Sequence, residues 1–235
     1  MQVLAPVGRD EGRTAELVRQ ETVHPVPYAR KCSVTDPSSI ESGPIRTFVA
    51  AEVPESVKAR IAGIVDPLRR QFRLRWTRPE GWHLTLKFLG ERTPKEVERI
   101  IGTAHEVAAR VRPFEAALGG WGAFPSPGRP RVLWVGTAVG AEELIGVATA
   151  LDKALAEAGF PPEEKEFHPH VTLARVDVAA VGADAFNRLQ ERPLAPQPFP
   201  VDRIVVFRSV LDRGGARYHP LAVECLRGGS RESVE

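Results

Sequence analysis

The sequence predicts an α+β domain in which two small antiparallel sheets flank a central cleft, with helices on the outside. Two observations lead to this prediction. Helical and strand patterns alternate along each half of the chain. Nearly the same tetrapeptide also occurs in both halves, as His-Leu-Thr-Leu at 83–86 and His-Val-Thr-Leu at 170–173. A duplicated, pseudo-twofold domain with one motif in each copy accounts for both observations.

The first half opens with a strand and an amphipathic helix. Pro54 stands at a helix start, and Val57, Ile61 and Leu68 form an apolar stripe at helical spacing. Pro67 is expected to kink or end this helix, because proline has no N–H for the helical ladder. The expected elements are a strand at 46–52, the helix from Pro54, a short strand at 74–76, a turn at 79–81 and the motif strand at 82–89.

Thr93 is expected to cap the clearest helix of the chain. Pro94 occupies the first helical position, and Glu96 completes a capping box. The elements that follow are strands at 113–119 and 131–137, joined by a loop at 120–130. This loop is long and rich in Gly and Pro, which indicates a functional or mobile segment.

The second half repeats the alternation of helices and strands. Its first helix ends at Gly159, a residue that tolerates the left-handed backbone found after helix ends. The expected elements are a helix at 141–158, the second motif strand at 169–176, a short helix near 183–190, a proline-rich loop at 192–200 and strands near 201–210 and 216–224.

Each motif places an imidazole and a hydroxyl side by side. Side chains alternate along a β-strand, so a His and a Thr two positions apart share one face while the apolar residues point into a core. Two such strands facing one cleft would supply two titratable groups and two hydroxyl donors. Histidine titrates near neutral pH, so one ring can act as an acid and the other as a base while the hydroxyls hold an anion.

The chain resembles the two-histidine phosphoesterases of the RNA 2',3'-cyclic phosphodiesterase group, also called LigT-like proteins or 2'-5' RNA ligases. The mark of this family is a pair of H-x-T-x tetrapeptides, and both are intact here at 83–86 and 170–173. Further similar stretches are Thr-Phe-Val-Ala at 47–50, the segment 76–90 and the segment 129–134. The resemblance runs from about Ile45 to about Cys225 and implies a bilobal fold.

The resemblance also implies residue roles. The first-motif histidine, His83, would be the proton donor to the leaving oxygen. The second-motif histidine, His170, would be the proton acceptor from water. Thr85 and Thr172 would hold the phosphate, and Arg175 would contact the phosphate or the substrate. The sequence alone does not separate the acid from the base.

The activity that the resemblance implies is hydrolysis of RNA 2',3'-cyclic phosphate ends to 2'-phosphate ends. Reverse 2'-5' RNA ligation would be a side activity. Protonating the alkoxide leaving group lowers much of the barrier, so we expect neither a metal nor a cofactor. The expected partner is RNA, with tRNA fragments among its candidates, and we expect a cytoplasmic monomer.

Composition divides the chain into three expected parts. Residues 1–44 are polar and lack periodicity, which indicates a flexible extension. The phosphoesterase domain is expected at 45–226 and a tail at 227–235. The chain contains no apolar run that could span a membrane and no signal-peptide pattern. Cys32 and Cys225 form no Cys-x-x-Cys pair, so both are expected to be thiols.

Several basic residues have two interpretations. The arginine-rich stretch 69–78, which also contains Phe72 and Trp76, could bind nucleic acid or could be a helix end followed by a solvated strand edge. Simple alternation puts Arg175 on the face opposite His170, unless the strand bulges or ends there. Lys87 has the parity to join the first motif, but we favour a solvated side chain.

Three alternatives to the RNA phosphodiesterase remain open at this point. The substrate could be a small cyclic nucleotide or an ADP-ribose cyclic phosphate. The chain could instead be an RNA-binding module without turnover, although binding alone does not need titratable groups in both motifs. His168 and His170 could also form part of a metal site in a metallohydrolase, although Pro169 intervenes.

Overall fold

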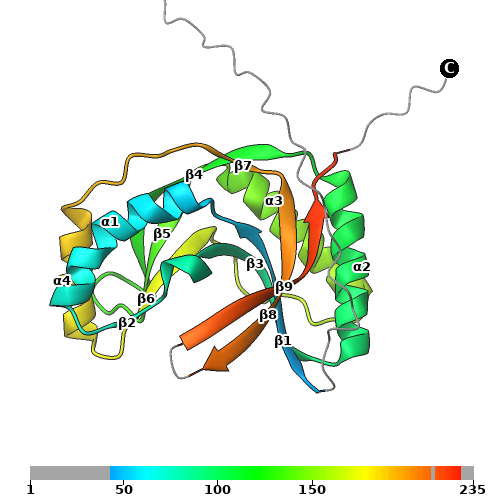
Figure 1. Cartoon of the computed structure of the whole chain (residues 1–235), viewed down its shortest axis with the longest axis horizontal. Coiled ribbons are helices and arrows are strands. Elements are labelled where there is room, and N and C mark those ends of the chain that lie inside the picture. Colours follow the sequence, from blue (N-terminus) through cyan, green and yellow to red (C-terminus); the bar gives the residue numbers. More distant parts are fainter. Residues whose placement is uncertain (1–42, 213–214, 229–235) are drawn as a thin grey trace, which may run out of the picture. The chain divides into compact units, whose positions relative to one another are not determined.

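The computed structural model describes residues 43–212 and 215–228. The expected flexible extension 1–44 therefore lies almost wholly outside the described residues, as does most of the expected tail 227–235. Within the described residues, nine strands form two antiparallel sheets accompanied by four α-helices, which confirms the predicted fold class (Figure 1).

The first sheet carries the first motif at one edge. Its strand order is β3-β1-β8-β9, so β1 runs between the motif strand and the carboxyl-terminal hairpin. The strands are β1 (Ile45–Glu52), β3 (His83–Arg92), β8 (Arg203–Asp212) and β9 (Gly215–Cys225). Helix α2 (Pro94–Arg110) packs against β1, β8 and β9, and α3 (Ala141–Glu157) packs against α2 and β3.

The second sheet carries the second motif on an inner strand. Its order is β2-β6-β5-β4-β7. The strands are β2 (Arg75–Trp76), β4 (Phe114–Phe124), β5 (Val132–Val139), β6 (His170–Arg175) and β7 (Phe199–Val201). Helix α4 (Ala179–Gln190) contacts β4 and α1 (Glu55–Gln71), while the short 3-10 helix η2 (Pro79–Gly81) links β2 to β3.

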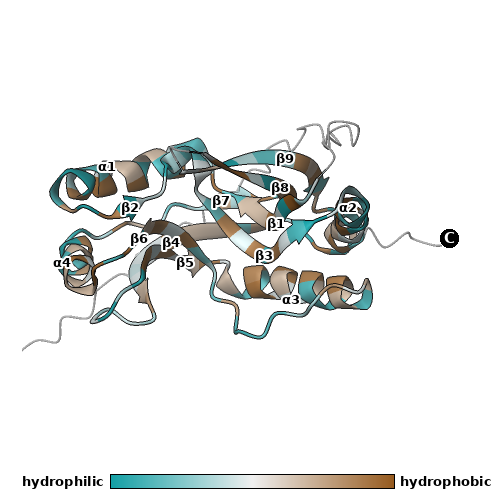
Figure 2. Cartoon of the chain, turned by 90° about the horizontal axis from the view of Figure 1, so that it is seen from below, coloured by the Kyte–Doolittle hydropathy of each residue, from teal (hydrophilic) through white to brown (hydrophobic). Residues whose placement is uncertain are grey.

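The helices form where the sequence predicts them because each has an apolar face and a defined start. In Figure 2 the helices alternate between hydrophobic brown and hydrophilic teal, as amphipathic helices do. The predicted capping box of α2 is confirmed: the Thr93 hydroxyl accepts a hydrogen bond from the backbone N–H of Glu96, and the Glu96 carboxylate accepts one from the N–H of Thr93.

The motif strand β3 contains a bulge. Thr85 pairs with Ala50 of β1, but the next register pair joins Lys87 to Val49, so Leu86 is an extra residue with no partner. A bulge residue shifts the alternation of side chains by one position. The two faces of the strand are therefore exchanged after Leu86, up to a second irregularity at Leu89.

The motif strand β6 contains the same bulge at the same motif position. Thr172 pairs with Trp134 of β5, and the next pair joins Ala174 to Leu133, so Leu173 is the extra residue. The bulges fall on the fourth residue of each His-x-Thr-x motif. The duplicated motif is therefore duplicated in backbone geometry as well as in sequence.

These bulges decide where the next two side chains of each strand point. Lys87 and Ala174 are buried in the interior, whereas Phe88 and Arg175 are exposed and line the same cavity as the motif threonines. Both sequence interpretations of Lys87 are therefore wrong, because its side chain is neither solvated nor beside the histidine. The predicted alternative of a bulge before Arg175 is correct.

Other boundaries differ from the predictions. Pro67 lies inside α1 and does not end it. The loop expected at 120–130 is shorter, because β4 continues to Phe124 across an irregularity between Leu118 and Trp121, where Gly120 has a φ of 77°. Cys225 is disulfide-bonded and not a thiol. The missing Cys-x-x-Cys spacing only excludes pairing between near neighbours.

Candidate active site

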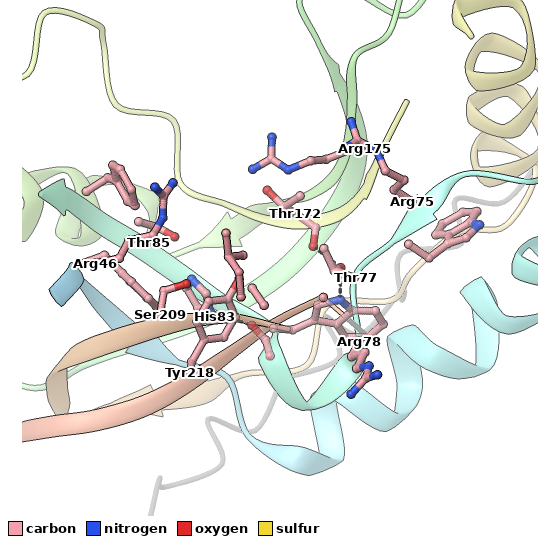
Figure 3. Close-up of a pocket in the computed structure, with 18 residues that line it drawn as sticks. Arg46, Arg75, Thr77, Arg78, His83, Thr85, Thr172, Arg175, Ser209 and Tyr218 are labelled. Carbon is pink, nitrogen blue, oxygen red and sulfur yellow. Dashed lines mark hydrogen bonds between the residues drawn. The ribbon is translucent and has the colours of Figure 1, made fainter. Parts of the chain in front are cut away.

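A cavity of about 630 Å³ lies between the motif strands of the two sheets. Its walls are made of aromatic rings, hydroxyls, arginines and one histidine, and no aspartate or glutamate is among the lining residues. Figure 3 shows Thr85 and Arg46 on one side and Thr172, Arg175 and Arg75 on the other. The lining residues are Arg46, Phe48, Arg75, Trp76, Thr77, Arg78, Gly81, Trp82, His83, Thr85, Phe88, Thr172, Arg175, Ser209, Leu211, Gly215, Ala216 and Tyr218.

Both motif histidines are oriented by the same hydrogen bond. The Nδ1 atom of His83 lies 2.7 Å from the carbonyl oxygen of Gly81, and Nδ1 of His170 lies 2.6 Å from that of His168. A carbonyl only accepts, so Nδ1 carries the proton in each ring. The Nε2 atoms of both rings are thereby left for a substrate.

The imidazole of His83 is enclosed by aromatic rings. It stacks on Phe48 with ring centroids 4.7 Å apart, and the edge of Tyr218 meets it at 4.9 Å. Burial lowers the pKa of His83 to about 4, and the nearby charges of Lys58 and His170 act in the same direction. His83 is therefore neutral at pH 7 in the free protein.

His170 lies at the start of β6 and packs against Phe124 and Trp134, with ring centroids 5.1 Å and 5.8 Å away. Burial lowers its pKa, and the charge of His168 lowers it further. His170 is not among the residues that line the cavity, although Thr172 on the same strand is. The charge of His170 is among the causes that lower the pKa of His83.

Four of the five predicted site residues line one cavity: His83, Thr85, Thr172 and Arg175. Arg175 reaches the cavity because of the bulge at Leu173. The fifth predicted residue, His170, does not line the cavity. Lys87, which the sequence offered as a further candidate, does not line it either. Its ammonium lies 2.5 Å from the Asp152 carboxylate and 3.1 Å from the carbonyl oxygen of Pro161, away from the motif face.

Thr77 is a site residue that sequence patterns did not reveal. Its hydroxyl donates to the backbone carbonyl of Thr172 at 2.8 Å and accepts from the Trp82 indole N–H at 2.8 Å. Its backbone N–H donates to the Leu173 carbonyl at 2.8 Å. Thr77 therefore connects the residue before His83 to the bulge of the second motif. These contacts span the two sheets, so no local pattern could have signalled them.

Tyr218 and Arg46 were also missed. Tyr218 lies on β9 and packs edge-on against the His83 ring, and burial raises the pKa of its phenol. Arg46 lies on β1 and stacks over the Phe88 ring at 4.7 Å. Both residues come from strands without a motif, and only the sheet order brings them to the cavity.

The described residues offer no further ligand for a metal site at His168 and His170. Across residues 43–212 and 215–228, no group of three or more His, Cys, Asp or Glu side chains is placed to hold an ion. His168 is exposed and contacts Phe124 at 6.0 Å between ring centroids.

Across residues 43–212 and 215–228, no helix is long and apolar enough to cross a lipid bilayer.

The two motif strands bring His83, Thr85 and Thr172 to one cavity, with His170 at the start of the strand that carries Thr172, and this arrangement is typical of a two-histidine phosphoesterase. Residues 53–213 match the family model described as the 2'-5' RNA ligase superfamily. The chain belongs to this family, which confirms the predicted resemblance.

Relatives of the chain include RNA 2',3'-cyclic phosphodiesterases from several prokaryotes. The Aeropyrum pernix protein is 39% identical over 143 residues, which cover 60% of this chain and 80% of that protein. The Thermotoga maritima protein is 34% identical over 191 residues, which cover 79% of this chain and 97% of that protein.

Solved structures share the fold over most of the described chain. The Thermus thermophilus protein TT0787 superposes with a TM-score of 0.63 at 32% identity, and covers 78% of this chain and 99% of its own. E. coli LigT complexed with 3'-AMP gives a TM-score of 0.63 at 26% identity, with the same coverage.

Proposed function

We propose that this protein is an RNA 2',3'-cyclic phosphodiesterase that hydrolyses cyclic phosphate ends of RNA to 2'-phosphate ends. The names of its relatives support this activity. The observation that carries the proposal is the matched geometry of the two motif strands. Each presents an imidazole oriented by a carbonyl two residues earlier, with a threonine hydroxyl beside it.

The proposed mechanism is an in-line displacement at phosphorus. His170 takes a proton from water at Nε2 while the water oxygen bonds to phosphorus. The bond between phosphorus and the 3' oxygen breaks, and His83 gives its Nε2 proton to that oxygen. The product carries a 2'-phosphate and a free 3'-hydroxyl. Thr85 and Thr172 donate hydrogen bonds to the non-bridging oxygens, where negative charge is held during the reaction.

The donor role of His83 needs a protonated ring, whereas burial keeps the free ring neutral. A bound cyclic phosphate carries a negative charge, which favours the protonated form of an adjacent imidazole. Substrate binding and protonation of His83 are therefore coupled in this mechanism. Arg175 adds a positive charge that holds the substrate on the second-motif wall.

The test uses an RNA oligonucleotide with a 2',3'-cyclic phosphate end, and separates the products by their phosphate position. The wild-type protein should give the 2'-phosphate and should keep its rate in EDTA. His83→Ala and His170→Ala should each lower kcat by roughly 10²- to 10⁴-fold. Full activity in either variant would reject the mechanism, and a 3'-phosphate product would contradict the proposed direction.

The finer assignments are part of the same proposal. The assignments include a monomeric enzyme. We place its substrates among cytoplasmic RNA fragments such as cleaved tRNA, with 2'-5' ligation as the reverse reaction. Sedimentation of the purified protein tests the monomer, and incubation with paired RNA halves tests the ligation.

A further inference from the structure

Two arginines face each other across neighbouring strands on one wall of the cavity. Arg75 of β2 is the register partner of Arg175 of β6, and both side chains line the cavity. Figure 3 shows them close together, on the side opposite Arg46 and Thr85. Like charges directly opposite in an antiparallel pair destabilise the sheet. An anion bound between them would remove this repulsion.

The cavity holds more positive charge than one cyclic phosphate needs. Four arginines line it, and no carboxylate does: Arg46, Arg75, Arg78 and Arg175. Arg78 and Arg175 form no ion pair with any side chain in the described ranges. A cyclic phosphate diester carries one negative charge, and in the proposed mechanism the motif threonines and imidazoles bind it.

Arg75 has one competing partner. Its guanidinium lies 2.9 Å from the Asp177 carboxylate, and the two side chains are 66% and 65% exposed. Exposed ion pairs of this kind contribute little to stability. A phosphate that also contacts Arg175 can therefore displace the Asp177 carboxylate from Arg75.

The rest of the arginine-rich stretch has other roles. Arg69 donates to the carbonyl of Thr77 and lies over the rings of Trp76 and Trp82, which makes it part of the packing beneath the site. Arg73 is exposed and does not line the cavity. Arg70 is likewise exposed and outside the cavity, so the five arginines of the stretch divide into one packing residue, two solvated residues and two cavity residues.

We propose that Arg75 and Arg175 form a subsite for the phosphodiester on the 5' side of the terminal nucleotide. This inference rests on the proposed function and narrows its substrate class. The enzyme binds an oligonucleotide whose last nucleotide carries the cyclic phosphate, in preference to a free cyclic mononucleotide. Planar guanidinium groups suit this task, because they bind phosphate through paired hydrogen bonds.

The test compares adenosine 2',3'-cyclic phosphate with the dinucleotide ApA bearing the same cyclic end. In the wild-type protein, kcat/KM for the dinucleotide should exceed that for the mononucleotide by about tenfold, mainly through a lower KM. Arg75→Ala should abolish most of this preference. Arg73→Ala, which removes an equally charged side chain outside the cavity, should keep it.

A second variant changes the preference in the opposite direction. Asp177→Asn removes the competitor for Arg75, so the dinucleotide preference should rise by roughly twofold. Equal kcat/KM for the two substrates in the wild-type protein, or an unchanged preference in both variants, would overturn the subsite. Hydrolysis of the mononucleotide by the wild-type protein would leave the proposed function standing in that case.

Discussion

His83 and its aromatic neighbours set the acidity of the site. Phe48 and Tyr218 cover the ring and remove it from water, which disfavours the imidazolium and lowers the pKa to about 4. A general acid with this pKa is mostly neutral at pH 7. In the proposed mechanism, the negative charge of the bound phosphate therefore has to favour the protonated ring that donates the proton.

A titration followed by NMR tests this coupling. In the free protein, the His83 ring signals should titrate with a midpoint at a pH of about 4. In the complex with adenosine 2'-monophosphate, the midpoint should rise by roughly one unit or more, because the phosphate charge stabilises the imidazolium. A midpoint that stays unchanged on binding would contradict the donor role.

The same shift predicts how stability depends on pH. The unfolded chain protonates His83 near pH 6.5, whereas the folded chain does so only at about pH 4. Between these values the unfolded state binds more protons, so the free energy of unfolding rises with pH. Denaturant unfolding across this window should show a flatter rise in His83→Gln than in the wild-type protein. An equal slope of the free energy of unfolding against pH in the two proteins would show that folding does not shift the pKa of His83.

Lys87 is predicted to act in folding and not in catalysis. Its side chain is 5% exposed and pairs with Asp152 of α3, so Lys87→Met leaves a partly buried carboxylate whose remaining partner is the backbone N–H of Glu163. We expect a loss of about 2 kcal/mol in the free energy of unfolding. Turnover should be unchanged. A wild-type melting temperature together with lost turnover would instead assign Lys87 to the site.

At the scale of elements, the matched bulges at Leu86 and Leu173 determine which side chains of the motif strands reach the cavity. They send Lys87 into the interior and bring Phe88 and Arg175 to the cavity. The strands themselves were predictable from alternation and from the motif. The bulges were not, because one extra residue in a strand depends on the register of its neighbour and leaves no periodic signal.

The segment around β2 is predicted to fix the spacing between the motifs through Thr77. Thr77→Val keeps the shape of the side chain but removes the hydroxyl that joins Trp82 to the carbonyl of Thr172. The indole N–H loses its partner, and we expect a cost of about 2 kcal/mol in stability. kcat should fall by about tenfold, because small displacements of catalytic groups are costly.

Thr77→Ser is the matched control, since it keeps the hydroxyl. It should retain most of the wild-type kcat, as measured by steady-state hydrolysis of a cyclic phosphate end. Wild-type kcat in Thr77→Val, with stability lowered as expected, would show that the link supports folding but not the geometry of catalysis.

At the scale of the whole molecule, local signals located the helices well and the cavity only in part. The capping box at Thr93 and the apolar stripe of α1 depend on near neighbours, so the sequence predicts them directly. Arg46 and Tyr218 reach the cavity through the order β3-β1-β8-β9. That order depends on long-range pairing, which a single sequence does not display.

The central claim is that His83 and His170 act on one phosphorus atom from the two motif strands. A crystal structure of the protein with adenosine 2'-monophosphate bound tests it most directly. We predict that the Nε2 atoms of both rings lie about 3 Å from oxygens of a single phosphate, with the Thr85 and Thr172 hydroxyls on its other oxygens. A phosphate held by one histidine, with the other ring turned away from it, would contradict the claim.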